Sequence, residues 1–183
     1  SSTSTGTFTD IADATSATFT ISDSAYVGKY LRLKVTKTNG NGSNSAYSAV
    51  TAAIAGTPAG TPTIGTSVEA SQQVSVPVTA PADLGGSTIT GYKYSVDGGQ
   101  TWSSTVQLVD GNLVIGSLTN GTTYSVAIRA VTQHGGDGNE TGLFSVTPFG
   151  APGAPVDIEV SLVGAALDIF VDWVAPAVTG GFA

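Results

Sequence analysis

The sequence predicts an all-β protein made of tandem β-sandwiches, one complete and two partial. Three observations favour this fold class. Only 10% of the 183 residues are charged, and the abundant Gly, Thr, Ser, Ala and Val favour short strands and turns over helices. Apolar and polar side chains alternate with a period of two in several segments. Segments of the chain also recur at an interval close to the roughly 100 residues of one sandwich domain.

The repeat interval comes from two pairs of matching segments. Pro62, in Thr-Pro-Thr-Ile, is matched by Pro155 at an offset of 93 (155 − 62). Pro81, in Ala-Pro-Ala followed by Gly-Gly, is matched by Pro176 at an offset of 95 (176 − 81). A weaker match places Leu31, Leu33 and Val35 about 93 residues before Tyr124, Val126 and Ile128.

These offsets divide the chain at two Gly/Pro-bearing stretches, 56–60 and 150–153, which we interpret as short linkers. We expect the C-terminal part of a sandwich at 1–55, a complete domain at 57–149 and the N-terminal strands of a further domain at 151–183. Two interpretations of the partial units stay open. Either the chain, which contains no Met, is a window cut from a longer array, or residues 151–183 complete the unit 1–55 of a neighbouring copy.

Strands are expected where the alternation is clearest. In Gln73–Thr79, Val74, Val76 and Val78 lie on one side, and Pro77 predicts an edge position or a bulge. In Thr88–Val96 a change of phase at Gly91 predicts a bulge. The other expected strands are 17–21, 30–38, 46–54, 62–68, 102–108, 113–118, 124–132 and 142–147.

The segment Leu118–Thr132 joins a tight turn to a strand. Asn120-Gly121 supplies the residues of a turn with positive φ, and Tyr124 begins the strand that follows. We predict a tyrosine corner, in which the hydroxyl of Tyr124 bonds to the backbone of this turn and Leu118 lies beside it.

The middle unit resembles a fibronectin type III domain, and so the immunoglobulin-like β-sandwich class. The likeness rests on the Pro-led first strand, Ile89-Thr-Gly-Tyr92, Leu118 and Tyr124, and on Asp172-Trp173-Val-Ala-Pro176 in the last unit. Val78 stands where the family pattern has Trp, so Trp102 or Tyr92 is expected to fill the space. Residues 22–38 resemble a second bacterial immunoglobulin-like surface repeat.

Charge and cysteine content exclude several classes of function. The formal net charge is −7 and the pI about 4.2, with six basic residues spread singly, which disfavours nucleic acid and anionic lipid as partners. No apolar run approaches the roughly 20 residues of a spanning helix. The absence of Cys excludes disulfides and thiolate metal sites.

The segment Ser95-Val-Asp97-Gly-Gly-Gln-Thr101-Trp102 fits the Asp-box pattern of sialidase-like propellers. A sialidase needs several copies and a cluster of Arg, whereas this chain has one copy and only Arg32 and Arg129. We therefore interpret the segment as a hairpin in which Asp97 accepts bonds from turn amides and Trp102 packs beneath.

The segment Gln133–Glu140 is expected to form a loop. Asp137, Asn139 and Glu140 in it offer oxygen ligands of the kind that Ca²⁺ prefers, so they are weak calcium candidates, although the spacing lacks a twelve-residue calcium-loop pattern. His134 is expected to be an exposed loop histidine without a catalytic role. Asn41, Asn120 and Asn139 begin N-glycosylation patterns, which turn sequences also explain.

These patterns predict a non-enzymatic structural or adhesive segment of a long extracellular bacterial protein, such as a surface layer, fibre or adhesin stalk. The resemblance implies neighbouring modules or copies of the same protein as partners, with cell-surface glycans or proteins as further candidates. The alternatives are accessory modules of a secreted carbohydrate-active enzyme or a decorative phage module. An exposed aromatic platform would favour the enzyme alternative, and the candidates for it are Trp102, Tyr94 and Tyr26.

Overall fold

A computed structural model describes residues 6–12, 14–21, 24–163, 168–177 and 179–181, and in this part of the chain the structure is almost entirely β. A short 3₁₀ turn, η1 (Ser24–Tyr26), precedes the first strand. The strands are β1 (Lys34–Asn39), β2 (Gly42–Tyr47), β3 (Thr63–Ile64), β4 (Val68–Ala70), β5 (Gln73–Thr79), β6 (Ile89–Ser95), β7 (Asn112–Ile115), β8 (Tyr124–Thr132), β9 (Gly136–Glu140), β10 (Phe144–Val146), β11 (Val156–Val163) and β12 (Asp168–Val174).

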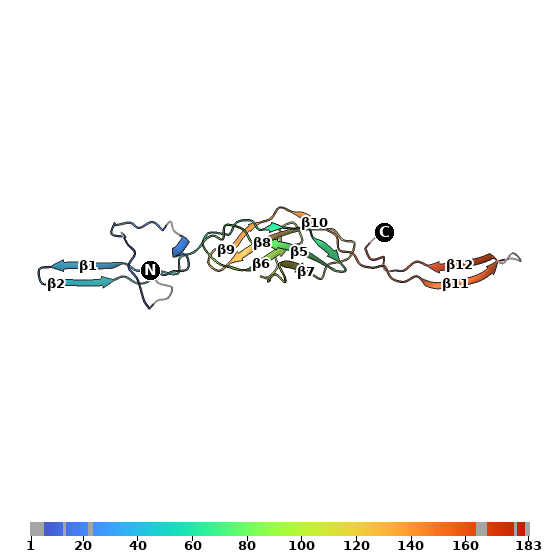
Figure 1. Cartoon of the computed structure of the whole chain (residues 1–183), viewed down its shortest axis with the longest axis horizontal. Coiled ribbons are helices and arrows are strands. Elements are labelled where there is room, and N and C mark those ends of the chain that lie inside the picture. The colour runs from blue at the N-terminus through green and yellow to red at the C-terminus, as the bar shows by residue number, and fades with distance from the viewer. Residues whose placement is uncertain (1–5, 13, 22–23, 164–167, 178, 182–183) are drawn as a thin grey trace.

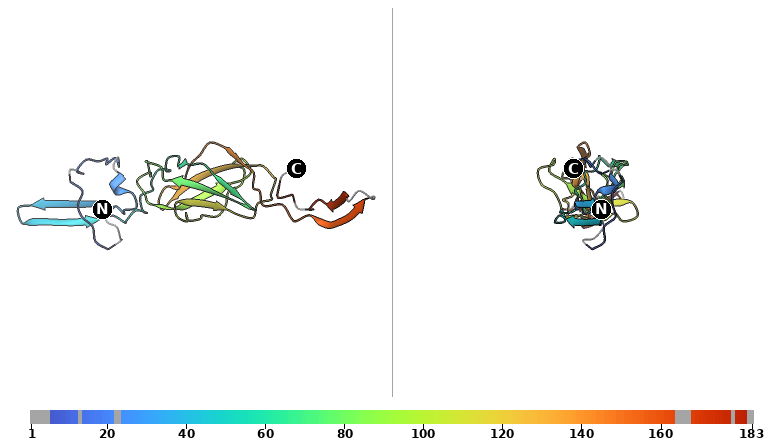
Figure 2. Two further views of the ribbon diagram at one scale, coloured as in Figure 1. Left: turned by 45° about the vertical axis from the view of Figure 1, so that its right-hand side comes forward. Right: turned by 90° about the vertical axis from the view of Figure 1, so that its left-hand side faces the viewer.

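Three units follow one another along the long axis of the molecule (Figure 1). The β1–β2 hairpin lies at one end, the sandwich of β3 to β10 in the middle, and the β11–β12 hairpin at the other end. Viewed along this axis, the units project onto one another within a narrow outline (Figure 2). The tandem organisation predicted from the repeat is therefore an end-to-end row.

One sheet of the middle sandwich is centred on β5. β3 and β4 pair with one edge of β5, with Ile64 opposite Val78 and Val68 opposite Ser75, and β7 pairs with the other edge. All these pairings are antiparallel. The broken strand β3/β4, the central β5 and β7 thus form one antiparallel sheet.

The second sheet is centred on β8, the strand that follows the predicted tyrosine corner. β6 pairs with one edge of β8, and β9 and β10 share the other edge. Residues 103–106 run beside β6 through the paired Tyr92 and Val106. A sheet of β3/β4, β5 and β7 that faces a sheet of β6, β8, β9 and β10 is the arrangement of a fibronectin type III-like sandwich. The predicted fold class is confirmed.

Apolar residues that alternate along the strands meet between the two sheets. Val74, Val76 and Val78 of β5 are buried, as the period-two pattern predicts. Facing them, Val126, Ile128 and Ala130 of β8 are fully buried. Tyr92 lies in the same core at 5% exposure, whereas Trp102 lies outside it, so Tyr92 is the aromatic residue that fills the core.

Pro77 lies in a central strand, so the predicted edge position is wrong. The interruption instead falls in the neighbouring strand, because β3 ends at Ile64, opposite Val78, and β4 begins at Val68, opposite Ser75, so that the gap between them faces Pro77. The N–H of Gly65 donates to the carbonyl of Pro77 at 2.9 Å. A break in the partner strand accommodates a residue that has no N–H to donate. The bulge predicted at Gly91 is confirmed by the register shift between Ile89 and Gly91.

Three other expectations about strands are corrected. Residues 102–108 form isolated bonds to β6 and no continuous strand, and 17–21 form no strand. Residues 136–140, expected in a loop, form β9 on β8. Pairing with β8, together with the bond from the N–H of Asn139 to the carbonyl of Ala59, gives the backbone of this Gly-rich segment partners within the protein.

The stretch 56–60 is not a free linker. Ala59 is fully buried, and its carbonyl accepts a bond from the N–H of Asn139 at 2.8 Å. The N–H of Gly60 donates to the carbonyl of Asp83 at 2.8 Å. The stretch interpreted as a short linker is thus held by backbone bonds to the middle sandwich.

The two outer units are hairpins that expose apolar side chains. In the first, residues 28–33 and 48–54 continue the pairing of β1 and β2, and Leu33 and Val35 are 62% and 58% exposed. In the last, Ile169, Val171 and Trp173 of β12 are 65%, 45% and 58% exposed. Neither hairpin has a second sheet within the described residues.

Candidate functional site

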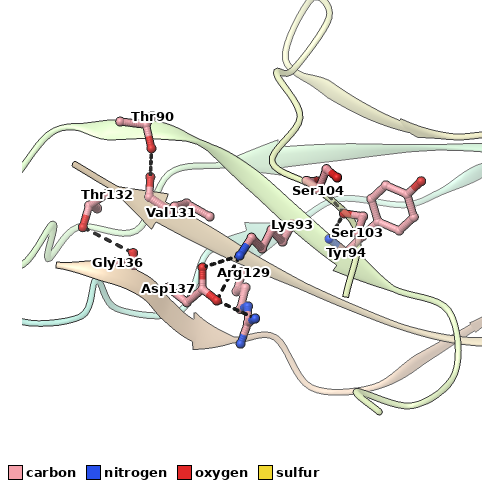
Figure 3. A network of polar contacts seen from close by, with 10 residues as sticks. All are labelled: Thr90, Lys93, Tyr94, Ser103, Ser104, Arg129, Val131, Thr132, Gly136 and Asp137. Carbon is pink, nitrogen blue, oxygen red and sulfur yellow. Dashed lines mark hydrogen bonds and ion pairs between the residues drawn. The ribbon is translucent and has the colours of Figure 1, made fainter. Parts of the chain in front are cut away.

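The solvent face of the β8 sheet carries a cluster of charged side chains. Asp137 of β9 lies between Lys93 of β6 and Arg129 of β8, at 3.0 Å from Lys93 Nζ and 2.6 Å from Arg129 Nη2 (Figure 3). Lys93 lies opposite Arg129 in the register, and Asp137 lies opposite Val131. The carboxylate therefore neutralises two cations on adjacent strands that would otherwise repel each other.

Trp102 covers the guanidinium of Arg129 on the same face. The guanidinium carbon lies 3.9 Å from the centre of the indole ring, a cation–π contact. The indole N–H donates to the carbonyl of Gly99 at 3.1 Å. Trp102 is partly buried, and its ring lies against the guanidinium within the molecule. Tyr94 and Tyr26 are partly buried as well.

The Asp-box segment forms the tight turn that the sequence predicts. One carboxylate oxygen of Asp97 accepts bonds from the hydroxyl of Ser95 at 2.6 Å and the N–H of Thr101 at 2.9 Å, and the other accepts from the hydroxyl of Thr101. Gly98 and Gly99 have φ of 76° and 89°, which glycine adopts without strain. The loop is internally bonded.

These hydrogen bonds also hold Asp97 in its ionised form. The Ser95 hydroxyl, followed by the Thr101 hydroxyl and N–H, lowers the pKa of Asp97 to about 2. A carboxylate whose acceptor sites are occupied by its own turn is suited to holding the turn and poorly suited to proton transfer. The geometry supports the structural interpretation of this motif.

The tyrosine corner is present. The N–H of Thr119 donates to the hydroxyl of Tyr124 at 3.0 Å, and Leu118 beside it is 7% exposed. The N–H of Leu118 in turn donates to the carbonyl of Gln72 at 3.0 Å, which ties the corner to the turn before β5. Trp173, at the position of Val78 in the repeat, lies in β12 and is exposed.

The three calcium candidates do not converge. Asp137 is engaged by Lys93 and Arg129, while Asn139 and Glu140 are exposed on β9. A carboxylate already paired with two cations is a poor ligand for a third, because the local charge repels Ca²⁺. In the described part of the chain, no group of three or more His, Cys, Asp and Glu side chains is placed to hold a metal ion.

His134 is partly buried, not an exposed loop residue. The backbone N–H of His134 donates to the hydroxyl of Ser87 at 2.9 Å, and its backbone carbonyl accepts from the N–H of Gly56 at 2.8 Å. The imidazole lies against Gly28 of the first unit. His134 and Val27 line an open depression where the first unit meets the sandwich. The position is a contact between units.

Sequence reasoning missed Lys93 and Arg129 as a paired cluster. Both occupy solvent-side positions of strands whose alternation was recognised, so the pattern places them on one face. Their common partner Asp137 was assigned to a loop, and only the pairing of β9 with β8 brings it between them. The signal that could have found the cluster was the register between strands, which one sequence does not contain.

Comparison with known proteins gives structural neighbours only. No protein-family model and no curated protein sequence matches the chain. The FN1–FN3 domains of chicken CNTN1 are similar, with 20% identity, a TM-score of 0.42 and coverage of 79% of this chain and 52% of that one. Domains A168–A170 from titin give 19% identity, a TM-score of 0.40 and coverage of 60% and 37%. The chain thus spans about half of the length of the first neighbour and a smaller share of the second.

Proposed function

We propose that this chain is a non-enzymatic spacer segment of a long extracellular protein, in which modules in a row separate or present other parts. The observation that carries the proposal is the end-to-end row of units along one axis (Figure 1). Fibronectin type III-like and immunoglobulin-like domains commonly serve as structural or adhesive modules. Each module added to such a row increases the distance between the two ends of the protein.

The chemistry of the sandwich supports this reading. The ionisable side chains that do meet, Lys93, Arg129 and Asp137, neutralise one another across strands. Asp97 is bonded within its own turn, and His134 packs between units. These groups stabilise the fold by contacts within the protein. Within the described residues, no helix is long and apolar enough to span a bilayer.

A bacterial surface protein, as a layer, fibre or adhesin stalk, is the setting we favour for this spacer. The support is compositional: an acidic chain rich in Thr, Ser and Gly, without Cys, in which the repeat interval is near 93. Neighbouring modules of the same kind are its proposed partners.

Stretching a single molecule by its two ends tests the proposal. A spacer should bear load as folded modules, so the sandwich should unfold in one cooperative step. Releasing about 90 residues at roughly 3.3–3.6 Å each gives a contour-length gain of about 30 nm, before the folded length is subtracted. Gradual extension without a step would contradict a load-bearing role.

A binding assay separates the spacer from the carbohydrate-active alternative. The full chain is passed over immobilised polysaccharides, with Trp102→Ala as the matched variant that removes the largest aromatic ring of the sandwich. The spacer function predicts no binding at micromolar concentration for either protein. Binding by the unaltered chain that Trp102→Ala abolishes would overturn it.

A further inference from the structure

The two junctions between units share the same hydrogen bonds at positions one repeat apart. In the first junction the N–H of Thr57 donates to the carbonyl of Gly85 at 3.1 Å. In the second the N–H of Gly150 donates to the carbonyl of Gly180 at 2.8 Å. The donors are 93 residues apart (150 − 57) and the acceptors 95 (180 − 85), the offsets of the sequence repeat.

The surface that receives each following unit is also repeated. The N–H of Gly28 donates to the carbonyl of Ile54 at 2.8 Å, and the N–H of Gly121 donates to the carbonyl of Pro148 at 2.8 Å. Gly28 and Gly121 have φ of 75° and 77° and are 93 residues apart (121 − 28). The same tight turn is therefore present in the first unit and in the sandwich, in each case where the following unit makes contact.

A Gly-Gly pair from the following unit packs on this turn in both cases. Gly86 lies against Ser24 and Val27 of the first unit, where a methyl group would come within 2.9 Å of side-chain carbons. Gly181 lies against Asn120 and Gly121 of the sandwich, where a methyl group would meet the N–H of Gly121 at 2.5 Å. Only a residue without a Cβ fits this close approach.

The first glycine of each pair is constrained by its own linker. A methyl group on Gly85 would overlap the carbonyl oxygen of Thr57, and one on Gly180 would overlap that of Gly150. Their φ values, 64° and 73°, also lie in the left-handed region. Each linker is thus fastened to the Gly-Gly loop that presses on the preceding turn.

We propose that this Gly-Gly clamp, formed by 85–86 on turn 24–28 and by 180–181 on turn 120–121, fixes consecutive modules at one relative orientation. The partner it recognises is a further module with the same turn. Short peptide linkers otherwise leave neighbouring domains free to move. With the clamp, each added module extends the row in the same direction, and a stiff rod results.

His134 adds a contact to the first junction. Its imidazole packs against Gly28, where a methyl group would come within 2.5 Å of Nε2. Together with Val27 on Gly86, this contact covers the receiving turn from two loops of the sandwich. Rotation of the first unit would have to break both contacts at once.

The inference rests on the proposed spacer function for its meaning, but its test is separate. Because the chain has no Cys, spin labels can be placed cleanly on Asn41→Cys, at the tip of the β1–β2 hairpin, and on Leu143→Cys, exposed on the sandwich. Double electron–electron resonance on the full chain then gives the distribution of distances between them. The clamp predicts one narrow distribution.

Glycine variants test whether the clamp is what makes the distance distribution narrow. Gly86→Val should broaden or shift the distribution, because its side chain cannot fit against Ser24 and Val27. Gly111→Val is the matched control: φ at Gly111 is 79°, so backbone strain is similar, but a methyl group there meets nothing within 4 Å. Gly28→Ala disturbs the same junction from outside the sandwich and should also broaden the distribution, even if Gly86→Val lowers the stability of the sandwich.

A broad distribution in the unaltered chain would overturn the clamp, as would narrow, unshifted distributions in both Gly86→Val and Gly28→Ala. Equal broadening by Gly111→Val would assign the effect to backbone strain and would also overturn it. These results would contradict the clamp but would still be compatible with the proposed spacer function, with modules that move relative to one another. Conversely, polysaccharide binding would remove the spacer function and leave a narrow distribution intact, so the two failures can be told apart.

Discussion

β5 and β12 occupy equivalent positions in the repeat, yet the apolar side chains of β5 are buried and those of β12 are exposed. Val74, Val76 and Val78 of β5 are 0%, 0% and 7% exposed. Ile169, Val171 and Trp173, each 95 residues later (173 − 78), are 65%, 45% and 58% exposed. The alternation is the same in both strands.

The difference lies in what faces the strand. β5 has β7 on one edge, and its apolar side chains meet those of the β8 sheet in the core. β12 pairs with β11 alone among the described strands. Alternation thus decides which face of a strand is to be buried, and a second sheet decides whether it is. Full burial of one large aliphatic side chain contributes about 1.5–3 kcal/mol, which a lone hairpin does not gain.

The largest effect that tests this comparison is the loss of a core side chain. Ile128→Ala should lower the free energy of unfolding of the sandwich by about 2–5 kcal/mol, since it leaves a cavity at a fully buried site. Ile169→Ala, at 65% exposure, should change it by less than about 0.5 kcal/mol. Urea denaturation, followed by Trp102 fluorescence in a Trp173→Phe background, measures both. Equal losses would show that β12 is packed in solution.

A smaller effect concerns the tyrosine corner, which closes the sandwich. Tyr124→Phe removes the hydroxyl that accepts the bond from Thr119 and should cost about 1 kcal/mol. Tyr47→Phe, 54% exposed on β2, is the control and should leave the urea midpoint of the sandwich unchanged. An unchanged midpoint for Tyr124→Phe would mean that water replaces the bond without loss.

Acid titration gives a third, pH-dependent effect in the sandwich. The pKa of Asp97, about 2, lies below its ordinary value of 3.8, so its contribution to stability is present above that ordinary value and is lost as pH falls toward 2. The difference in melting temperature between the wild-type protein and Asp97→Asn should therefore shrink between pH 4 and pH 2. Asp110→Asn, at an exposed turn, is the comparison variant. A difference that stays constant with pH would argue against the bonded carboxylate.

The fluorescence of the two tryptophans reports separately on the sandwich and on the last hairpin. Trp102 is partly buried against Arg129, and Trp173 is 58% exposed. Acrylamide, a neutral quencher, should reduce the fluorescence of Trp102→Phe, which retains Trp173, more steeply than that of Trp173→Phe. Similar Stern–Volmer slopes would remove the contrast between sandwich and hairpin.

Calcium should have the smallest effect. Because Asp137 is paired with Lys93 and Arg129, we expect millimolar Ca²⁺ to leave the melting temperature unchanged. A site filled at 100 times its Kd would add about 2.7 kcal/mol, which is easily measured. A rise in melting temperature that is lost in Asp137→Asn would show that β9 rearranges to hold the ion.

Local features could be predicted from residues close together in the chain. The alternation placed β5, β6 and β8 and their buried faces, the Asn-Gly turn before Tyr124 predicted the corner, and Asp97 with two glycines predicted a self-bonded turn. Each of these depends on periodicity or on bonds that span a few residues, which sequence order carries directly.

Other features depend on which strands lie side by side. The conversion of 136–140 from an expected loop into β9, and with it the pairing of Asp137 with two cations, follows from the register against β8. Pro77 could occupy a central strand because its neighbour breaks between β3 and β4. These outcomes combine segments distant in sequence, and one chain read by itself does not specify their alignment.

By itself, the sequence determined the all-β class, the interval of about 93 residues, the turns and the face of each strand that is apolar. The tertiary structure decided which of those faces are covered, and that residues 56–60 are bonded in place instead of forming a free linker. It also showed that the repeated Gly-Gly pairs meet the turn of the preceding unit. The physical reason is that burial and close approach are properties of pairs of surfaces, and a pattern within one segment describes only one surface of each pair.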